Sequence, residues 1–561
     1  METSFRKILN LSLRVAVFSA ATASAVHGQG VNADQTKRID ELFAKWDRTD
    51  SPGCALSVMQ GGHIVYKHAY GMANLDYDVI LTTDTPFHVA SLSKQFTATA
   101  VVLLEQDGKL SFDDDVHKYI SELSDFGAKI TIRNLLHHTS GLRDQWDLLD
   151  LAGWRYSLDL ITNDDVMSVV TRQKALNFAP GAEYSYSNTG YTLLGEIVKR
   201  VSGKSLREFT TERIFTPLGM KNTHFRDDHA EVIKHQAYGY SHKEQTGWEL
   251  SVTNFDTVGA TSLFTTVEDL ALWDENFYSG KVGGPRFTET MLHHDPLTNG
   301  ESDPYAFGLV TGKYRGLDTV EHSGSDAGYR SDILRFPQQH FSVACLCNAG
   351  NANPSTLTKK VTDVLLAADL KEAEGAKAKT TSIALPADQL STKLGYYYEA
   401  QTRELRKVVL KDGGLGLDVG DEVLPLHAIT SDRFQIAEYP VEMQFSAGMG
   451  GLLSLRMGTP GEKMNPYEQL APYTLPVQQQ KEYVGNYRSA EIDPVYRIVE
   501  ENGRLMLKRL KHDAEAMTAA GPDLFQAEIG TIQFERDGKK TVVKMKLSTG
   551  RIRDLEFAKE K

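Results

Sequence analysis

Cysteine is scarce in this sequence, with three residues in 561, at positions 54, 345 and 347. Their spacing does not suit a zinc site. All three lie in apolar, strand-like runs, at 53–56 and 343–347. They are either small buried hydrophobic side chains or include one disulfide, from Cys54 to Cys345 or Cys347, if those strands are neighbours.

A basic surface is also lacking. The 61 Lys and Arg residues are outnumbered by 74 Asp and Glu residues, which gives a formal net charge of −13. This balance argues against a nucleic-acid partner, because phosphate binding needs clustered cations. Two catalytic patterns are absent as well. Without His-Glu-x-x-His a zinc protease has no ligands, and without Gly-x-Ser-x-Gly an α/β-hydrolase is disfavoured.

Long apolar runs are confined to the N-terminus. Arg6 and Lys7 precede an apolar stretch over 8–26 that ends in small residues, which is typical of a signal peptide. We therefore predict a signal peptide over 1–28 and a periplasmic or secreted bacterial protein. Arg14 interrupts the stretch, so a retained anchor is the weaker interpretation, and no cysteine follows it to support a lipoprotein. No other segment could cross a membrane.

The pattern of strands and helices predicts one domain over 29–370. Strand-like runs occur at both ends of this region and surround a largely helical stretch over 91–215. This arrangement favours a discontinuous α/β domain whose sheet combines both ends. The expected strands are 54–59, 63–68, 306–310, 319–321, 329–336 and 341–347, and the expected outer helices are 33–47 and 354–370.

The rest of the chain contains an internal repeat. After a charged, small-residue linker over 371–389, Leu394-Gly395-Tyr396-Tyr397 matches Val484-Gly485-Asn486-Tyr487, and other matches keep an offset near 90 residues. Each copy alternates short strands with Gly and Asp turns, which predicts two small antiparallel β-barrels, at 390–475 and 476–561. We expect a barrel loop to wall the active-site cleft and restrict substrate size.

Ser91 and Lys94 are the first candidate catalytic pair. They lie three residues apart where an extended run turns into a helix, so their side chains share one helix face. A serine hydroxyl needs a base to become a nucleophile, and lysine can be that base if burial lowers its pKa. Alone, Ser-x-x-Lys is a weak signal, because both residues are common.

Two further motifs complete the candidate site. In Tyr186-Ser187-Asn188, the tyrosine can shuttle protons as a phenolate and Asn188 can hold a substrate amide with its donor and acceptor. His322-Ser323-Gly324 follows at the end of a strand. We expect Gly324 and Ser325 to contact the substrate, with the backbone N–H groups of Ser91 and Ser325 forming an oxyanion hole.

The ordered set Ser91-Leu92-Ser93-Lys94, Tyr186-Ser187-Asn188 and His322-Ser323-Gly324 resembles the three motifs of penicillin-recognising serine hydrolases. It is most similar to the class C β-lactamase branch, over about residues 35–370. The resemblance implies an antiparallel sheet flanked by helices with an all-helical subdomain, acyl-enzyme chemistry, and no metal or organic cofactor. Two lipocalin-like barrels after such a domain further resemble the D-aminopeptidase arrangement.

One departure bears on the substrate. Many members have lysine in the third motif where this chain has His322, a group that is largely neutral near pH 7. The change weakens the case for substrates with a free carboxylate and favours a small peptide, amide or ester. A β-lactamase, a carboxylesterase and a non-hydrolytic penicillin-binding sensor remain alternatives, and a homo-oligomer is compatible with the sequence. We expect His137, His138 and Glu183 to be structural or solvent-exposed.

Overall fold

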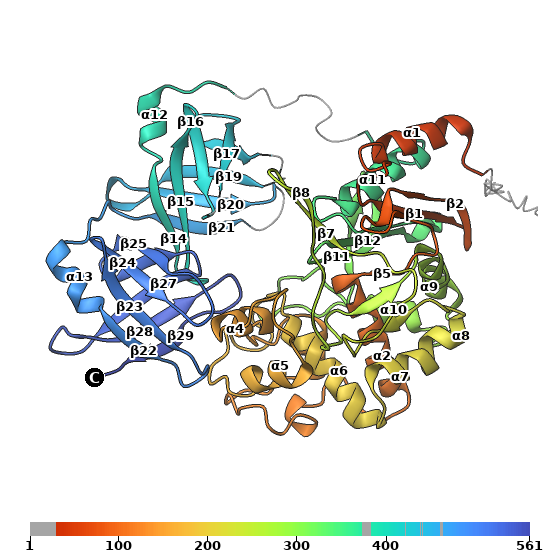
Figure 1. The fold of residues 1–561 in the computed structure, drawn as a ribbon, viewed down its shortest axis with the longest axis horizontal. Helices are drawn as coiled ribbons and strands as arrows, with labels where there is room; N and C mark the ends of the chain where they lie inside the picture. Colours follow the sequence, from red (N-terminus) through yellow and green to blue (C-terminus); the bar gives the residue numbers. More distant parts are fainter. Residues whose placement is uncertain (1–29, 373–382, 421, 438, 440, 461–463) are drawn as a thin grey trace, which may run out of the picture.

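The computed structural model describes residues 30–372 and 383–561, apart from 421, 438, 440 and 461–463 (Figure 1). The predicted signal peptide and most of the predicted linker lie outside these residues. The described chain forms an α/β domain, which carries the predicted catalytic residues and is called the catalytic domain below, and two barrels, which lie to one side of it. None of the helices within the described ranges has the length and apolar composition needed to cross a membrane.

The catalytic domain is built on a six-stranded antiparallel sheet in the order β10-β11-β12-β13-β1-β2. The two strands at one edge come from the N-terminal part of the domain and the other four from its C-terminal part, so the predicted discontinuous sheet is confirmed. The strands are β1 (Cys54–Gln60), β2 (His63–Tyr70), β10 (Val310–Tyr314), β11 (Leu317–Asp326), β12 (Tyr329–Phe336) and β13 (Phe341–Cys347).

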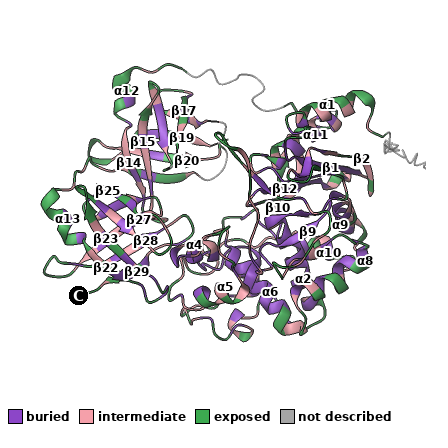
Figure 2. Cartoon of the chain, viewed as in Figure 1, coloured by how far each residue is buried: buried purple, intermediate pink, exposed green. Residues whose placement is uncertain are grey.

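Helices cover both faces of this sheet. On one face, α1 (Ala33–Phe43) and α11 (Pro354–Leu365) enclose a core that includes Phe43, Val343 and Val361. The opposite face packs on α9 (Val267–Ser279) and the helical subdomain through a second and larger core (Figure 2). Both α1 and α11 are shorter than predicted. The α11 helix ends at Leu365, and its cap residue Leu366 has left the helical conformation.

Along the chain, the helical subdomain lies between the strands that form the two halves of the sheet. Its central helix α6 ends at Gly203, whose φ of +72° is the left-handed conformation that ends many helices. The helices are α2 (Lys94–Gln106), α3 (Ile132–Leu136), α4 (Gln145–Leu151), α5 (Asn163–Val170), α6 (Asn188–Ser202), α7 (Leu206–Thr210), α8 (Thr216–Leu218) and α10 (Phe287–Met291), with short helices η1 (Ala90–Ser93), η2 (Val116–Lys118) and η3 (Thr211–Phe215). A further short helix, η4 (Pro337–Gln339), connects β12 to β13. Three small sheets complete the domain. Two are strand pairs, β3 (Met72–Asn74) with β4 (Val79–Ile80) and β7 (Tyr240–Lys243) with β8 (Gly247–Leu250), and the third has the order β5-β9-β6, with β5 (Phe87–His88), β9 (Leu263–Thr265) and β6 (His224–Phe225).

Two strand predictions were wrong in their bounds. The strand expected at 306–310 begins only at Val310, because Gly308, with φ of +72°, turns the chain against the start of α2. A Cβ at Gly308 would overlap the backbone of Lys94 and Gln95. The strand expected at 319–321 extends to Asp326, so His322 and its neighbours lie inside β11 instead of at its end.

A disulfide between Cys54 and Cys347 joins β1 to β13, and the two residues are directly paired in the ladder. Cys345 remains a free, buried thiol on the same side of β13. Of the two possibilities that the sequence left open, the structure has the disulfide.

The C-terminal third of the chain forms two closed eight-stranded antiparallel barrels, as predicted. The first follows α12 (Ala387–Ser391) and the second follows α13 (Val477–Tyr483). The first barrel comprises β14 (Gly395–Glu399), β15 (Glu404–Lys411), β16 (Gly414–Asp418), β17 (Val423–Ala428), β18 (Arg433–Ile436), β19 (Glu442–Ala447), β20 (Leu453–Gly458) and β21 (Asn465–Gln469). The second comprises β22 (Gly485–Arg488), β23 (Val495–Glu501), β24 (Arg504–Lys508), β25 (Glu515–Gly521), β26 (Leu524–Ala527), β27 (Gly530–Arg536), β28 (Val542–Ser548) and β29 (Leu555–Lys559).

Candidate active site

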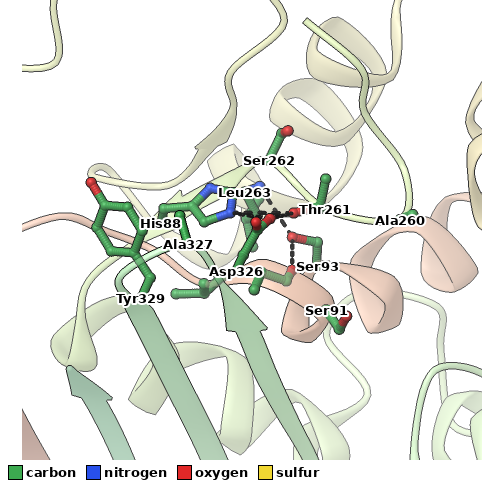
Figure 3. A network of polar contacts seen from close by, with 12 residues as sticks. His88, Ser91, Ser93, Ala260, Thr261, Ser262, Leu263, Asp326, Ala327 and Tyr329 are labelled. Atoms are coloured by element: carbon green, nitrogen blue, oxygen red, sulfur yellow. Dashed lines mark hydrogen bonds and ion pairs between the residues drawn. The ribbon is translucent and has the colours of Figure 1, made fainter. Parts of the chain in front are cut away.

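Ser91 lies in a tight turn between β5 and α2. The residue before it, Ala90, has φ of +50°, a left-handed conformation that costs a non-glycine residue about 1 kcal/mol. Ser93 stabilises this turn: its hydroxyl donates to the Ala90 carbonyl (2.5 Å) and accepts from the Leu263 N–H (3.1 Å) (Figure 3). The strained conformation is therefore supported by contacts on both sides.

Strand β11 passes directly beside this turn. A Cβ on Gly324 would overlap the Val89 carbonyl oxygen and the Ser331 hydroxyl. The Ser331 hydroxyl donates to that same carbonyl at 2.7 Å. Gly324 thus allows the strand to pack against the nucleophile turn, and its predicted contact with the substrate stays a prediction.

Lys94 is fully buried at the start of α2. Its Nζ lies 3.1 Å from Ser91 Oγ, 2.9 Å from Asn188 Oδ1 and 2.8 Å from the Ala260 carbonyl oxygen. Burial lowers the pKa of Lys94 to about 7. The charge of Asp144 opposes this shift, while that of Arg551 adds to it. Near neutral pH a substantial fraction of Lys94 is thus the free amine that a general base requires.

Tyr186 lies beside Lys94, whose Nζ is 4.8 Å from the centre of the tyrosine ring. Burial raises the pKa of Tyr186 above its ordinary value, although a hydrogen bond with Ser91 lowers it by a smaller amount. The resting residue is therefore a neutral phenol. This differs from the predicted phenolate, because burial outweighs the nearby positive charges.

Asn188 is the first residue of α6, and both ends of its amide bind the protein. Its Oδ1 accepts from Lys94, while its Nδ2 and its backbone N–H donate to Asp144 Oδ2 at 2.9 and 2.7 Å. Asp144 is fully buried. Asn188 thus links Lys94 to a buried carboxylate, and the role in substrate binding that we predicted for it remains untested.

His322 lies within β11 and is buried. Its Nδ1 donates to the Ser323 carbonyl (2.7 Å) and its Nε2 accepts from the Tyr305 hydroxyl (3.0 Å). Burial, together with the charge of Lys94, lowers the pKa of His322 to about 3. The imidazole is neutral at physiological pH, and its ring centre lies 6.5 Å from that of Tyr186. The three predicted motifs therefore converge.

His137 and His138 hydrogen-bond to backbone groups beside the site. His138 Nδ1 accepts from the Ser187 N–H at 3.1 Å, and its ring lies 4.2 Å from that of Tyr186. Burial lowers its pKa well below the ordinary value. His137 Nδ1 bonds the Tyr305 carbonyl at 2.8 Å. These contacts agree with the structural role we expected.

A buried polar network anchors the end of β11 beside Ser325. Asp326 accepts hydrogen bonds from His88 Nε2 (2.9 Å) and from the Thr261 hydroxyl (2.8 Å) (Figure 3). The Tyr156 hydroxyl donates to its other oxygen. These bonds fix the strand one residue beyond Ser325, whose predicted role as an oxyanion donor requires a fixed backbone N–H.

The second barrel contributes a residue to this site. Arg551, on the loop between β28 and β29, has its guanidinium carbon 5.3 Å from the centre of the Tyr186 ring and a nitrogen 3.5 Å from Asp144 Oδ2. On the same loop, Arg553 forms an ion pair with Glu183 (2.9 Å). Glu183 is therefore an interdomain contact, not the exposed acid we expected.

Two groups of potential metal ligands occur in the described part of the chain. Cys54, Cys345 and Cys347 form one group, but two of its sulfurs are joined in the disulfide. Asp228, His229 and Asp256 form the other, at the surface, with His229 bonded to Asp256. Neither contacts Ser91, and we assign no metal to them.

Four site residues escaped sequence reasoning: Asp144, Tyr305, Asp326 and Arg551. Asp144 lies in the mixed polar segment Leu142-Arg143-Asp144-Gln145, where nothing in the sequence marks it as buried. Arg551 could have been found by aligning the repeats, because the first barrel has Gly461 at that position. Tyr305 and Asp326 carry no comparable signal.

A family model described as Beta-lactamase matches residues 39–368, more than half of the chain. The chain belongs to this family. The predicted resemblance is thereby confirmed, as is the α/β fold with two following barrels.

Individual relatives agree with this assignment. "Penicillin-binding protein 4*" of Bacillus subtilis is 29% identical over 435 residues, which cover 74% of this chain and 94% of the relative. A D-aminopeptidase of Brucella canis is 28% identical over 308 residues, 54% of this chain and 58% of the relative. Among solved structures, an octameric penicillin-binding protein homologue from Pyrococcus abyssi aligns with a TM-score of 0.56 and 23% identity, covering 77% of this chain and 99% of the other. The structural match supports the fold alone.

Proposed function

We propose that this protein is a secreted serine hydrolase of the D-aminopeptidase type, which cleaves a peptide or amide through an acyl-enzyme on Ser91. One observation carries the proposal: a fully buried lysine with a pKa of about 7 lies 3.1 Å from the Ser91 hydroxyl. A base needs a pKa near the working pH to be effective, and this geometry meets that requirement.

The proposed reaction begins with Lys94 as a free amine. Ser91 Oγ attacks the substrate carbonyl as its proton passes to Lys94, and the N–H groups of Ser91 and Ser325 stabilise the oxyanion. The phenol of Tyr186 then gives its proton to the leaving amine and is reprotonated from Lys94. In the second half, water attacks the acyl-enzyme by the reverse proton path, which frees the acid and restores Ser91.

Because His322 is neutral, we favour an amide substrate that presents no carboxylate to the third motif. A lysine there would offer a fixed cation, whereas the imidazole is held neutral by burial and by its bond from Tyr305. The D-aminopeptidase relative favours an aminoacyl substrate. An esterase or β-lactamase would use the same groups, and a penicillin-binding sensor would acylate without turnover.

A substrate panel separates these possibilities. Wild type and Ser91→Ala are compared on D- and L-amino-acid p-nitroanilides, p-nitrophenyl esters of short acids and a chromogenic cephalosporin. We expect turnover of at least one D-aminoacyl p-nitroanilide, and a loss of more than 10³-fold in Ser91→Ala with the circular dichroism spectrum unchanged. Activity retained by Ser91→Ala would point to another nucleophile. A stable penicilloyl mass on Ser91 without turnover would favour the sensor.

Export is part of the proposal and rests on the N-terminal sequence alone. The mature N-terminus, determined on protein recovered from the periplasm or culture medium, should follow residue 28. A homo-oligomer is a further prediction, for which light scattering on the full-length mature chain is the direct test.

A further inference from the structure

The second barrel holds its β28–β29 loop firmly against the catalytic domain. The Arg551 N–H donates to Asp147 Oδ2 at 3.2 Å, and the Arg551 carbonyl accepts from Asn177 Nδ2 at 2.9 Å. The next residue, Ile552, is fully buried in the shared core. The backbone of Arg551 is therefore fixed from both sides, while 43% of its side chain is exposed.

The guanidinium lies at the edge of the catalytic group, against the ring of Tyr186. Its carboxylate neighbour is Asp144, and that 3.5 Å contact is longer than the bonds of 2.7 and 2.9 Å that the same Asp144 oxygen accepts from Asn188. Asp147 accepts the loop's backbone N–H, and Glu183 is paired with Arg553. A guanidinium has five N–H donors, so Arg551 has donors left for a ligand.

The place of Arg551 decides which part of a substrate it would meet. Tyr186 is the group proposed to protonate the leaving amine, so a group beside its ring belongs to the leaving half of the substrate. Arginine recognises planar anions such as carboxylates through paired hydrogen bonds. Through Arg551, the second barrel thus supplies a fixed cation that the third motif, with neutral His322, does not.

We propose that Arg551 is a specificity residue that binds a carboxylate on the leaving group, so the preferred substrate is an aminoacyl amide whose amine product is acidic. This inference rests on the proposed function. It also reverses the expectation drawn from His322: the site accepts a carboxylate, but on the side of Tyr186 and not beside β11.

The test uses two matched amides of alanine, in the enantiomer that the substrate panel selects. One has 3-aminobenzoate as its leaving group and the other has 3-aminobenzamide, so they differ by one negative charge. For the full-length mature protein we expect a kcat/KM ratio of about 10 or more in favour of the carboxylate, as is usual for a charged hydrogen bond. The ratio should fall as NaCl is raised, because the guanidinium is half exposed.

Variants at two positions assign this ratio to the charge. Arg551→Gln should bring it to about one, Arg551→Lys should keep part of it, and Arg551→Glu should invert it. Arg553→Gln is the matched control on the same loop and should leave the ratio in place. An unchanged ratio in Arg551→Gln, a ratio of one in wild type, or an equal loss in Arg553→Gln would overturn the proposal.

A binding measurement separates this proposal from the proposed function. If wild type hydrolyses neither amide through Ser91, the proposed function fails, and calorimetric titration with 3-aminobenzoate and 3-aminobenzamide still tests Arg551. Tighter binding of the carboxylate, lost in Arg551→Gln but not in Arg553→Gln, would support the site. Equal binding of the two compounds would refute it.

Discussion

The two barrels share one topology but are attached to the catalytic domain in different ways. The second barrel's interior forms a single hydrophobic cluster with the helical subdomain, and buried polar contacts such as Tyr496 to the Leu151 carbonyl (2.8 Å) cross the boundary. The first barrel has its own separate core. Among the described residues, no hydrogen bond or ion pair joins it to the catalytic domain; it contacts the second barrel, for example through Arg403 and Asp554.

The repeated sequences explain this difference. In the docked loop the second barrel has Thr549-Gly550-Arg551-Ile552-Arg553, where the first has Thr459-Pro460-Gly461-Glu462-Lys463. The positions that build the barrel have been kept, while those that bury Ile552 and present Arg551 differ. Within the described residues, the loop of the second barrel is therefore the one that docks on the catalytic domain.

The largest effect should come from Arg143→Ala. This buried guanidinium donates to Glu491 of the second barrel (2.6 Å) and to the Arg553 carbonyl (2.9 Å). Its removal leaves the buried Glu491 carboxylate without its cationic partner, with only the Lys174 N–H, among the described residues, still bonded to it, so we expect a loss of about 3–5 kcal/mol in the free energy of unfolding. Urea denaturation measures it, and a loss below about 1 kcal/mol would show that the second barrel is held no more firmly than the first.

Ile552→Ala tests the apolar half of the same interface. The side chain is fully buried in the core shared by the barrel and the helical subdomain. Truncation should cost about 2–4 kcal/mol through lost burial and the cavity left behind. Urea and thermal unfolding of wild type and Ile552→Ala measure this loss in the free energy of unfolding. A neutral result would mean that the loop packs through its polar contacts alone.

The pH dependence of catalysis shows whether the second barrel influences the chemistry. Lys94 must be neutral to act as a base, so kcat/KM should rise about tenfold per pH unit below its pKa of about 7 and level off above it. Because the charge of Arg551 lowers that pKa, Arg551→Gln should move the midpoint to higher pH. Arg433→Gln, in the first barrel, should not move it. If wild type, Arg551→Gln and Arg433→Gln gave the same pH profile of kcat/KM, the second barrel would have no influence on the pKa of Lys94.

Arg403→Ala should have the smallest effect. The ion pair between Arg403 and Asp554 joins the two barrels, but more than a third of each side chain is exposed. Solvent screening limits such pairs to less than about 1 kcal/mol. A change in stability comparable to that of Arg143→Ala would mean that the first barrel, too, is an integral part of the catalytic unit.

The sequence predicted the parts of the molecule that local pattern specifies. The three motifs, the sheet built from both ends of the domain and the duplicated barrels are all visible in short segments and their order. The strand predicted over 306–310 was wrong because its apolar pattern reflects core packing and not strand pairing. Phe307 and Leu309 are buried in the core on either side of Gly308, where the chain turns against α2.

The remaining residues depend on contacts between distant segments. Asp326 gains its role from His88, which lies 238 positions earlier in the chain, and Arg551 reaches Asp144 from another domain. The protonation state of Tyr186 was mispredicted for a similar reason. The sequence motifs show that positive charges lie near Tyr186, and these would lower its pKa. They do not show how deeply His138 and the loop of the second barrel bury its ring, and that burial raises the pKa.

The pairing of β1 with β13 has a consequence for how the protein is made. The two strands are separated by 293 positions along the chain, so at about 5–20 residues per second a ribosome needs about 15–60 s to deliver the second after the first. Ser91, Lys94, Tyr186 and His322 are all synthesised within that interval, and Arg551 follows after it. The sheet that carries His322 therefore cannot close, and the emerging chain cannot hydrolyse a substrate, before β13 has been made.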